Sequence, residues 1–223
     1  MKINKPKFWE TKNIISLTLL PVATLLQLLI GLKKIFIKPI KFKIPIICIG
    51  NIYLGGTGKT PLCIWLIAKF EKDGKNPALI KKYYLNHIDE HNLIKNKTKN
   101  LYLNKKRSKA IFDAEKLGHD LAILDDGFQD KSIAQDLKIL CFNSKQLIGN
   151  SMTIPSGPLR ESFKSIKNSD IIIINGKKNE IFEEKIKKIS NKIEIFYSKY
   201  IPINIDEFKK KKNLAFAGIG NPK

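Results

Sequence analysis

The stretch GNIYLGGTGKTPL, from Gly50 to Leu62, decides the fold of this chain. It follows the apolar run IPIICI and precedes a second apolar run, CIWLIAKF, so a buried strand, a glycine-rich loop and a helix are expected in succession. The glycines of the loop let backbone N–H groups turn toward phosphate oxygens, because side chains in their place would block the approach. The stretch therefore predicts a phosphate-binding loop of the P-loop type.

The residues around the last glycine of the loop predict how it would hold a nucleotide. Lys59 is expected to reach the β- and γ-phosphates, and the hydroxyl of Thr60 is expected to ligate Mg²⁺. A helix that begins at Thr60 adds the positive end of its dipole. Tyr53 stands where the usual pattern has its first glycine, and a glycine turn without a ligand is the alternative. The predicted nucleotide-binding residues of the loop are Gly55, Gly56, Thr57, Gly58, Lys59 and Thr60.

A P-loop also needs an acid at the end of a neighbouring strand to help hold the metal ion. The segment LAILDDG supplies Asp125 and Asp126 directly after an apolar run. Because ligands of open α/β sheets bind at the carboxyl ends of the strands, either carboxylate would lie near the glycine loop. We expect Asp125 to be the metal ligand. Two solvated carboxylates in a turn are the alternative.

The rest of the chain alternates between apolar runs and helical patterns, which predicts an α/β fold. We expect a P-loop NTPase-like core with a mostly parallel sheet flanked by helices. The polar segment 86–100 precedes a short strand and receives no element of its own. The predicted strands cover 42–50, 77–84, 101–103, 119–125, 137–142, 170–175 and 193–200, and the predicted helices cover 60–72, 105–118 and 179–189.

The N-terminal region contains an apolar stretch from Ile14 to Leu32 with lysines on both sides. Its length would just permit a membrane span, but Ser16, Pro21 and Gln27 are among the residues that dilute it. A helix that lies in one leaflet, with its lysines among the headgroups, fits the pattern better. The alternatives are a helix packed on the body of the protein and a true transmembrane anchor.

The pattern divides the chain into three parts. Residues 1–40 are expected to form the interfacial membrane helix, and 41–205 the P-loop core. The segment NLAFAGIGNPK, at the end of 206–223, has the pattern of a strand followed by a glycine turn. We therefore expect 206–223 to begin a second α/β domain, with the rest of that domain beyond the given sequence.

Composition narrows the possible partners. The formal net charge of +21 comes almost entirely from lysine, since Arg107 and Arg160 are the only arginines. Proteins that read bases prefer arginine and interleave aromatic residues, so no nucleic-acid partner is expected. A basic surface favours anionic lipid headgroups. The isolated cysteines have no metal-binding spacing, which indicates buried thiols in a reducing cytoplasm. They are Cys48, Cys63 and Cys141.

Four segments in this order, PIICIGNIYLGGTGKTPL, ILDDGFQD, IPSGPLRES and FAGIGNPK, resemble the tetraacyldisaccharide 4′-kinase family. The resemblance implies a P-loop kinase that moves the γ-phosphate of ATP onto the 4′-hydroxyl of a tetraacyldisaccharide 1-phosphate, the lipid A precursor. It implies ATP and Mg²⁺ as cofactors, and no obligate protein partner. It also implies work at the cytoplasmic face of the bacterial inner membrane, as a peripheral or monotopic protein.

The resemblance extends to individual residues. Asp89 in HIDEHNL matches the general base, with Glu90 as its companion, and Asp126 matches a further catalytic position beside Lys59. Gln129 matches a nucleotide contact. Glu161 matches an acid in the family's GPLRE segment and is expected to bind the metal with Thr60 and Asp125. A loop carboxylate without a catalytic role is the alternative for Asp89.

This sequence departs from the family pattern at three places. Lys82 replaces the arginine of an Arg-Gly-Tyr-Gly run, and both glycines of that run are lost. Asp130 replaces a histidine that often follows the Asp-Asp-Gly segment. The histidine that pairs with the base lies in the family's C-terminal domain, so no histidine of this sequence is assigned to that role.

Two other classes of function are compatible with parts of this pattern. A membrane-associated P-loop ATPase would use its nucleotide state to gate partner binding and would hydrolyse ATP without transferring phosphate to a sugar. A basic nucleic-acid-binding module would show affinity that falls steeply with salt. The scarcity of arginine makes this module the least favoured reading.

Overall fold

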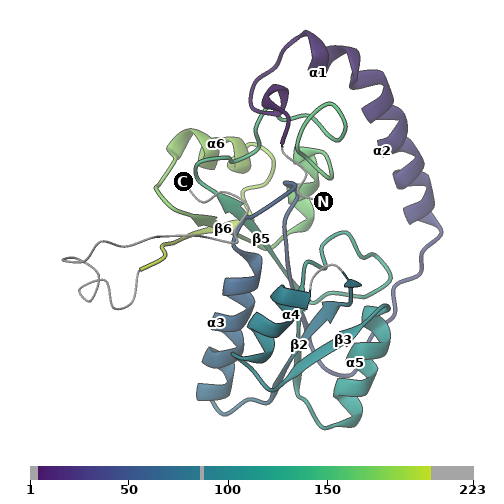
Figure 1. Ribbon diagram of the computed structural model, residues 1–223, viewed down its shortest axis with the longest axis vertical. Coiled ribbons are helices and arrows are strands. Elements are labelled where there is room, and N and C mark those ends of the chain that lie inside the picture. Colours follow the sequence, from purple (N-terminus) through teal and green to yellow (C-terminus); the bar gives the residue numbers. More distant parts are fainter. Residues whose placement is uncertain (1–4, 86–87, 202–223) are drawn as a thin grey trace.

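The structure of the protein is a computed structural model that describes residues 5–85 and 88–201 (Figure 1). In this part of the chain seven strands form one sheet in the order β3-β2-β4-β1-β5-β6-β7, and all neighbouring strands are parallel. The predicted α/β fold is therefore confirmed. The predicted start of a second domain, 206–223, lies outside the described residues. The strands are β1 (Ile46–Gly50), β2 (Pro77–Lys82), β3 (Leu101–Asn104), β4 (Leu121–Asp125), β5 (Leu137–Asn143), β6 (Ile171–Asn175) and β7 (Glu194–Ser198).

Helices cover both faces of the sheet. Alternate residues of β1 enter two separate apolar clusters, as the two-residue period of a strand requires. Ile47 and Ile49 share a cluster with residues of α3 and α4, whereas Ile46 and Cys48 share one with residues of α5 and α6. The helices are α1 (Ile14–Thr18), α2 (Leu20–Ile35), α3 (Lys59–Lys72), α4 (Ile88–Lys95), α5 (Arg107–Lys116) and α6 (Glu180–Lys187), with 3-10 turns at Lys7–Trp9 and Phe163–Asn168.

The strand order places the glycine loop at the point where the chain changes direction across the sheet. β1 is the central strand, with β4 on one side and β5 on the other. The elements from β2 to β4 lie on one side of β1, and those from β5 onward lie on the other. Loops at the carboxyl ends of strands diverge at such a point and leave room for a ligand. The loop between β1 and α3 opens there.

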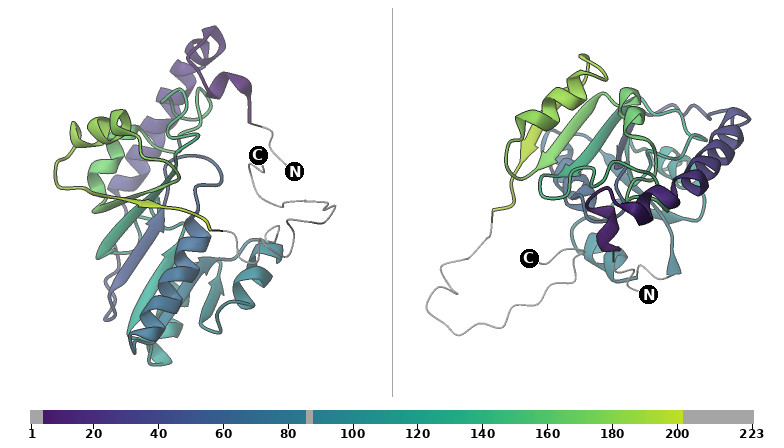
Figure 2. Two further views of the ribbon diagram at one scale, coloured as in Figure 1. Left: turned by 90° about the vertical axis from the view of Figure 1, so that its left-hand side faces the viewer. Right: turned by 90° about the horizontal axis from the view of Figure 1, so that it is seen from above.

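The predicted N-terminal helix over 14–32 is two helices, α1 and α2. The side chain of Asn13 accepts a hydrogen bond from the backbone of Ser16, and the Ser16 hydroxyl accepts one from the backbone of Asn13, so a reciprocal cap begins α1. Pro21 falls in the first turn of α2, where its missing N–H costs nothing. Figure 2 shows this pair of helices, here called the arm, projecting past the end of the sheet. Among the described residues, no helix has the length and apolar character needed to cross a bilayer.

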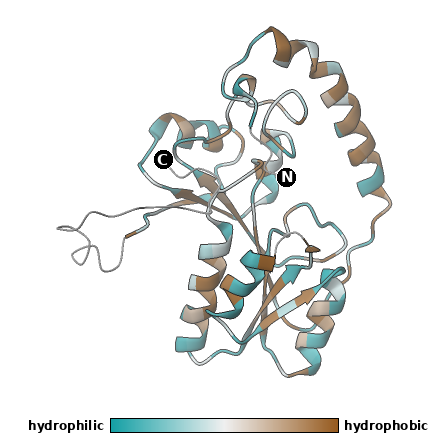
Figure 3. Ribbon diagram, viewed as in Figure 1, coloured by the Kyte–Doolittle hydropathy of each residue, from teal (hydrophilic) through white to brown (hydrophobic). Residues whose placement is uncertain are grey.

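The arm has one side on the protein and one side in the open. Trp9, just before α1, is buried and donates its indole N–H to the carbonyl of Pro155 at 3.0 Å, and Ala23 of α2 is fully buried. Other apolar residues of the arm are exposed, including Leu25 and Leu28 at 58% and 60%. Figure 3 shows that hydrophobic residues predominate along α2. The packed interpretation of the sequence therefore holds for one side of this segment, and the interfacial interpretation stays a prediction.

The structure differs from the sequence prediction at α4 and at the end of β2, and it agrees at the end of α5. α4 lies inside the polar segment 86–100, for which the sequence predicts no element. Only His91 and Ile94 of this short helix are buried, so its apolar pattern is weak. β2 is predicted to reach residue 84 but ends at Lys82. Lys82 pairs with Asn104, the last residue of the neighbouring strand β3. α5 ends just before Gly118, whose φ of +79° confirms it as a helix stop.

The cysteines are buried, as the sequence predicts, and none forms a disulfide. Burial raises the pKa of the Cys48 and Cys141 thiols to about 12. Burial also raises the pKa of Cys63 well above its usual value. All three sulfur atoms therefore remain protonated and act as small apolar groups of the core.

Gly50 at the end of β1 allows the backbone to approach Phe128 closely. A Cβ at this position would lie 2.4 Å from the Cβ of Phe128, which is fully buried. We expect Gly50→Ala to lower the free energy of unfolding by about 1–3 kcal/mol in urea denaturation, because the core cannot accept the extra methyl group. Gly31→Ala is the control, since a Cβ at Gly31 would meet nothing within 4 Å. Equal midpoints for the two variants would contradict this account.

Candidate active site

Asn51 organises the glycine loop from inside. Its side chain is fully buried, and its Nδ2 lies 2.7 Å from the carbonyl of Tyr53, 3.2 Å from that of Gly55 and 3.0 Å from the hydroxyl of Thr57. One amide group thus ties three points of the loop together. Sequence analysis did not single out Asn51.

Two glycines of the loop have backbone conformations that favour glycine. Gly55 has a φ of +124° and Gly58 a φ of +89°. At Gly58 a side chain would also collide with Asn175 and Tyr200, which approach from the end of β6 and from beyond β7. Asn175 donates a hydrogen bond to the carbonyl of Thr57. The far half of the sheet therefore helps to shape the loop. At Gly56, by contrast, a Cβ would point into open space.

Thr60 and Asp125, the predicted metal ligands from α3 and β4, meet at the end of the sheet. The Thr60 hydroxyl lies 3.0 Å from Oδ2 of Asp125 and 2.9 Å from Oε1 of Glu90 on α4. Lys81 at the end of β2 approaches the same two carboxylates, with its Nζ 2.5 Å from Asp125 Oδ2 and 3.1 Å from Glu90 Oε1. Four elements therefore bring one hydroxyl, two carboxylates and one ammonium to a single point.

The donor atoms at this point fit Mg²⁺. Hydroxyl and carboxylate oxygens are the hard ligands that this ion prefers. Asp125 is 1% exposed, and within residues 5–85 and 88–201 its Oδ1 has no hydrogen-bond partner, so a buried acceptor is left unsatisfied there. In this described part, no three His, Cys, Asp or Glu side chains gather to hold a metal by themselves. Such a site suits an ion that takes its other ligands from phosphate and water.

Lys81 is a functional candidate that sequence analysis missed. Burial would lower the pKa of Lys81, but the charges of Asp125 and Glu90 outweigh burial and raise that pKa, so the ammonium stays charged. The neighbouring Lys82, which stands in place of the family's arginine, has its ammonium over the ring of Tyr84, 5.5 Å from its centre. The register between β2 and β4 would have identified Lys81, because it places Lys81 directly beside Asp125.

Asp126 is held by two cations. Nη1 of Arg160 lies 3.0 and 2.9 Å from its two carboxylate oxygens, and Nζ of Lys59 lies 3.6 Å from Oδ1. Burial alone would raise the pKa of Asp126. The charges of Lys59 and Arg160 outweigh burial and hold that pKa below its ordinary value of 3.8. Asp126 therefore remains ionised and links the lysine of the glycine loop to Arg160.

Arg107 braces the turn that carries both aspartates. It projects from α5, and its Nη2 donates to the carbonyl of Asp126 at 2.7 Å, while its Nη1 lies 3.2 Å from the carboxylate of Asp130. Asp126 itself has a φ of +60°, a strained conformation for a residue with a side chain. Both arginines of this lysine-rich chain thus converge on the Asp-Asp-Gly turn.

Residues 15–90 and 86–223 match the family described as tetraacyldisaccharide-1-P 4′-kinase. The chain belongs to the tetraacyldisaccharide 4′-kinase family. A relative named tetraacyldisaccharide 4′-kinase from Pelagibacter ubique (strain HTCC1062) is 45% identical over 100% of this chain and 72% of its own length. Another of that name, from Ruthia magnifica subsp. Calyptogena magnifica, is 32% identical over 95% of this chain and 74% of its own length.

A solved structure of LpxK from Aquifex aeolicus in complex with ATP shares the fold. It superposes with a TM-score of 0.62 at 20% sequence identity and covers 90% of this chain and 86% of that chain. The family resemblance predicted from the four sequence segments is confirmed by these matches.

The remaining residues implied by the resemblance to tetraacyldisaccharide 4′-kinases lie around this centre or beside it. Gln129 donates from Nε2 to the carbonyl of Asn51 at 2.8 Å and so supports the glycine loop. Its role as a nucleotide contact stays a prediction. Asp89 is exposed in the first turn of α4, directly before Glu90, and its role as the base also stays a prediction.

In the described part of the chain, Glu161 takes no part in the contacts that join Thr60 and Asp125. Its Oε1 is 2.5 Å from the Nζ of Lys34 on the arm, so the carboxylate has a cation of its own. The second carboxylate that meets the Thr60 hydroxyl is that of Glu90. The ion pair with Lys34 is an alternative role for the Glu161 carboxylate, and its role as a metal ligand stays a prediction.

Lys81 gives a direct test of the four-residue cluster. We expect Lys81→Met to lower the free energy of unfolding by about 3–5 kcal/mol in metal-free buffer, because removing one partner leaves a buried carboxylate uncompensated. Added Mg²⁺ should recover part of that loss. Lys82→Met is the matched control and should change stability by less than about 0.5 kcal/mol. If the two variants unfold at the same urea concentration, Lys81 does not have this role.

Proposed function

We propose that this chain is an ATP-dependent kinase that transfers the γ-phosphate of ATP to the 4′-hydroxyl of a tetraacyldisaccharide 1-phosphate, the lipid A precursor. The observation that carries the proposal is the meeting of Thr60 and Asp125 beside a glycine loop, in a chain of the tetraacyldisaccharide 4′-kinase family. Residues 41–205 form the kinase core in this proposal, and 1–40 form the part that binds the membrane.

The glycine loop and α3 bind the triphosphate. Backbone amides between Gly55 and Thr60, with the dipole of α3 behind them, attract the phosphate oxygens. Lys59 contacts the β- and γ-phosphates, and Asp126 keeps its ammonium in place from the opposite side. Thr60 and Asp125 would hold Mg²⁺, which when bound neutralises charge on the β- and γ-phosphates. Glu90 is the third oxygen donor at that point.

Asp89 is the proposed base for the acceptor hydroxyl. It takes the proton of the 4′-hydroxyl as the sugar oxygen forms its bond to the γ-phosphorus, and the bond from that phosphorus to the β,γ-bridging oxygen breaks, leaving ADP. A positioned base contributes about a hundred- to ten-thousandfold in rate. The exposed position of Asp89 at the start of α4 supports this role, because a lipid-borne sugar must reach the base from outside.

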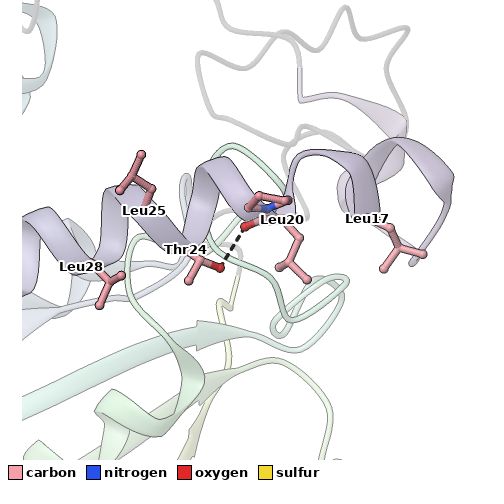
Figure 4. A pocket seen from close by; sticks show the side chains of 6 residues that line it. Leu17, Leu20, Thr24, Leu25 and Leu28 are labelled. Carbon is pink, nitrogen blue, oxygen red and sulfur yellow. Dashed lines mark hydrogen bonds between the residues drawn. The ribbon is translucent and has the colours of Figure 1, made fainter.

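The arm suits an acceptor that is itself a lipid. A shallow apolar depression of about 480 Å³ lies along it, lined by leucines of α1 and α2 together with Pro21 and Thr24 (Figure 4). Lys33 is exposed at the end of α2, where its cation meets anionic headgroups, whereas Lys34 is paired with Glu161. We place the arm at the cytoplasmic leaflet of the bacterial inner membrane, with the rest of the chain peripheral to it.

The kinase proposal is tested with detergent-dispersed disaccharide lipid and radiolabelled Mg-ATP. Wild type should yield a 4′-phosphorylated lipid, and Lys59→Ala should lower kcat at least about a hundredfold through loss of charge stabilisation at the transferred phosphate. Lys72→Ala, at the exposed end of α3, is the control for the loss of a lysine. Label released as free phosphate alone would indicate an ATPase and contradict the proposal.

The membrane proposal is tested with vesicles that contain anionic phospholipid. The double variant Leu25→Asp and Leu28→Asp should bind them at least about tenfold more weakly, since each buried leucine contributes about 1.5–3 kcal/mol. Leu117→Asp provides a control, because this leucine is 68% exposed after α5, away from the arm. Unchanged co-sedimentation of the double variant would exclude the arm as the membrane-binding surface.

A further inference from the structure

The arm contacts two adjacent residues in the segment between β5 and β6, Arg160 and Glu161. Nε2 of Gln27 on α2 donates to the carbonyl of Arg160 at 3.3 Å. Two turns further along α2, Nζ of Lys34 forms the 2.5 Å ion pair with Glu161, whose residue exposure is 8%. One contact fixes the backbone of this short segment, and the other neutralises its buried carboxylate.

The same two-residue segment continues into the nucleotide site. The backbone N–H of Arg160 donates to the carbonyl of Ile52 at 2.7 Å, just before the glycine loop. The guanidinium of Arg160 grips both oxygens of Asp126, and Asp126 in turn faces Lys59 at 3.6 Å. A continuous series of contacts therefore leads from α2 through Arg160 to the lysine of the glycine loop.

We propose that Lys34 and Gln27 are positioning residues of the nucleotide site, which hold the Arg160–Glu161 segment so that Arg160 orients Asp126 against Lys59. The inference rests on the proposed function insofar as Lys59 is taken to bind the phosphates of ATP. It gives the arm a second role besides contact with lipid: the arm sets the affinity of the glycine loop for Mg-ATP.

The energetics favour Lys34 as the sensitive point. A buried carboxylate that loses its cation is strongly destabilised, so Glu161 must find another partner or the segment must shift. Lys131 is a second cation on which the charge of Glu161 acts. Either rearrangement displaces Arg160, the residue directly before Glu161, from its contact with both oxygens of Asp126. Nη1 of Arg160 alone reaches both carboxylate oxygens, so this contact depends on where the rigid guanidinium lies.

The test compares Lys34→Met with Lys33→Met in the full chain. Both variants remove one lysine from the same turn of α2, but Lys33 is exposed whereas Lys34 is partly buried. Isothermal titration without lipid should show that Lys34→Met raises the Kd for Mg-ATP about tenfold, which corresponds to one strong contact. Lys33→Met should stay within about twofold of wild type, and Lys34→Arg should recover most of the affinity.

A double-mutant cycle separates positioning from direct metal binding. If Glu161 acts through Lys34, Lys34→Met combined with Glu161→Gln should weaken Mg-ATP binding no more than the worse single variant. Fully additive losses would show that Glu161 contacts the metal or nucleotide independently and would overturn the inference. Unfolding midpoints of all variants show whether an affinity change reflects the site or a loss of folded protein.

The outcomes distinguish this inference from the proposed function. Wild type that binds Mg-ATP and phosphorylates the lipid, with Lys34→Met matching Lys33→Met, would refute only the positioning role. Wild type that binds Mg-ATP without phosphorylating the lipid, with Lys34→Met weakened, would refute only the kinase assignment. Wild type that fails to bind Mg-ATP would refute both.

Discussion

The parallel pairing of β1 with β4 is the constraint on which the rest of the site depends. In this register Ile49 lies beside Asp125, so the loop after β1 and the acid at the end of β4 emerge at the same edge. Side chains alternate along a strand, and a shift of one residue would turn Asp125 to the opposite face. The contact between the Thr60 hydroxyl and Asp125 follows from that register, and Glu90 and Lys81 join it from α4 and β2.

Arginine has a different task from lysine in this molecule. Lysines are spread along the chain, whereas Arg107 and Arg160 both serve the Asp-Asp-Gly turn. Arg107 holds a backbone carbonyl of the turn, and Arg160 holds a carboxylate with two nearly equal contacts. A rigid fork of donors can fix a strained turn in one conformation, which a flexible ammonium does less well. The two arginines therefore have a structural role at this turn that the lysine-rich composition does not indicate.

Much of the fold and part of the site could be predicted from sequence, because those features have local patterns. The strand, glycine loop and helix around Thr60 are contiguous, and Asp125 ends an apolar run. The roles of Asn51 and Lys81 could not be predicted, because they arise from contacts that no local sequence pattern shows. α4 escaped because a short helix with few buried residues leaves little periodic signal. The packing of the arm was only partly predictable, because apolar content alone does not reveal which side of a helix contacts the protein.

The position of Lys81 also bears on the electrical state of the centre. Its single positive charge faces the two negative charges of Asp125 and Glu90, so these three side chains together carry one unit of negative charge. A divalent ion added to them reverses the sign and leaves one unit of positive charge facing the polyphosphate. Long-range attraction would therefore act first on the free metal ion and, once it has arrived, on the anionic nucleotide. The ammonium thus limits repulsion between the acids while keeping the pocket attractive to a cation.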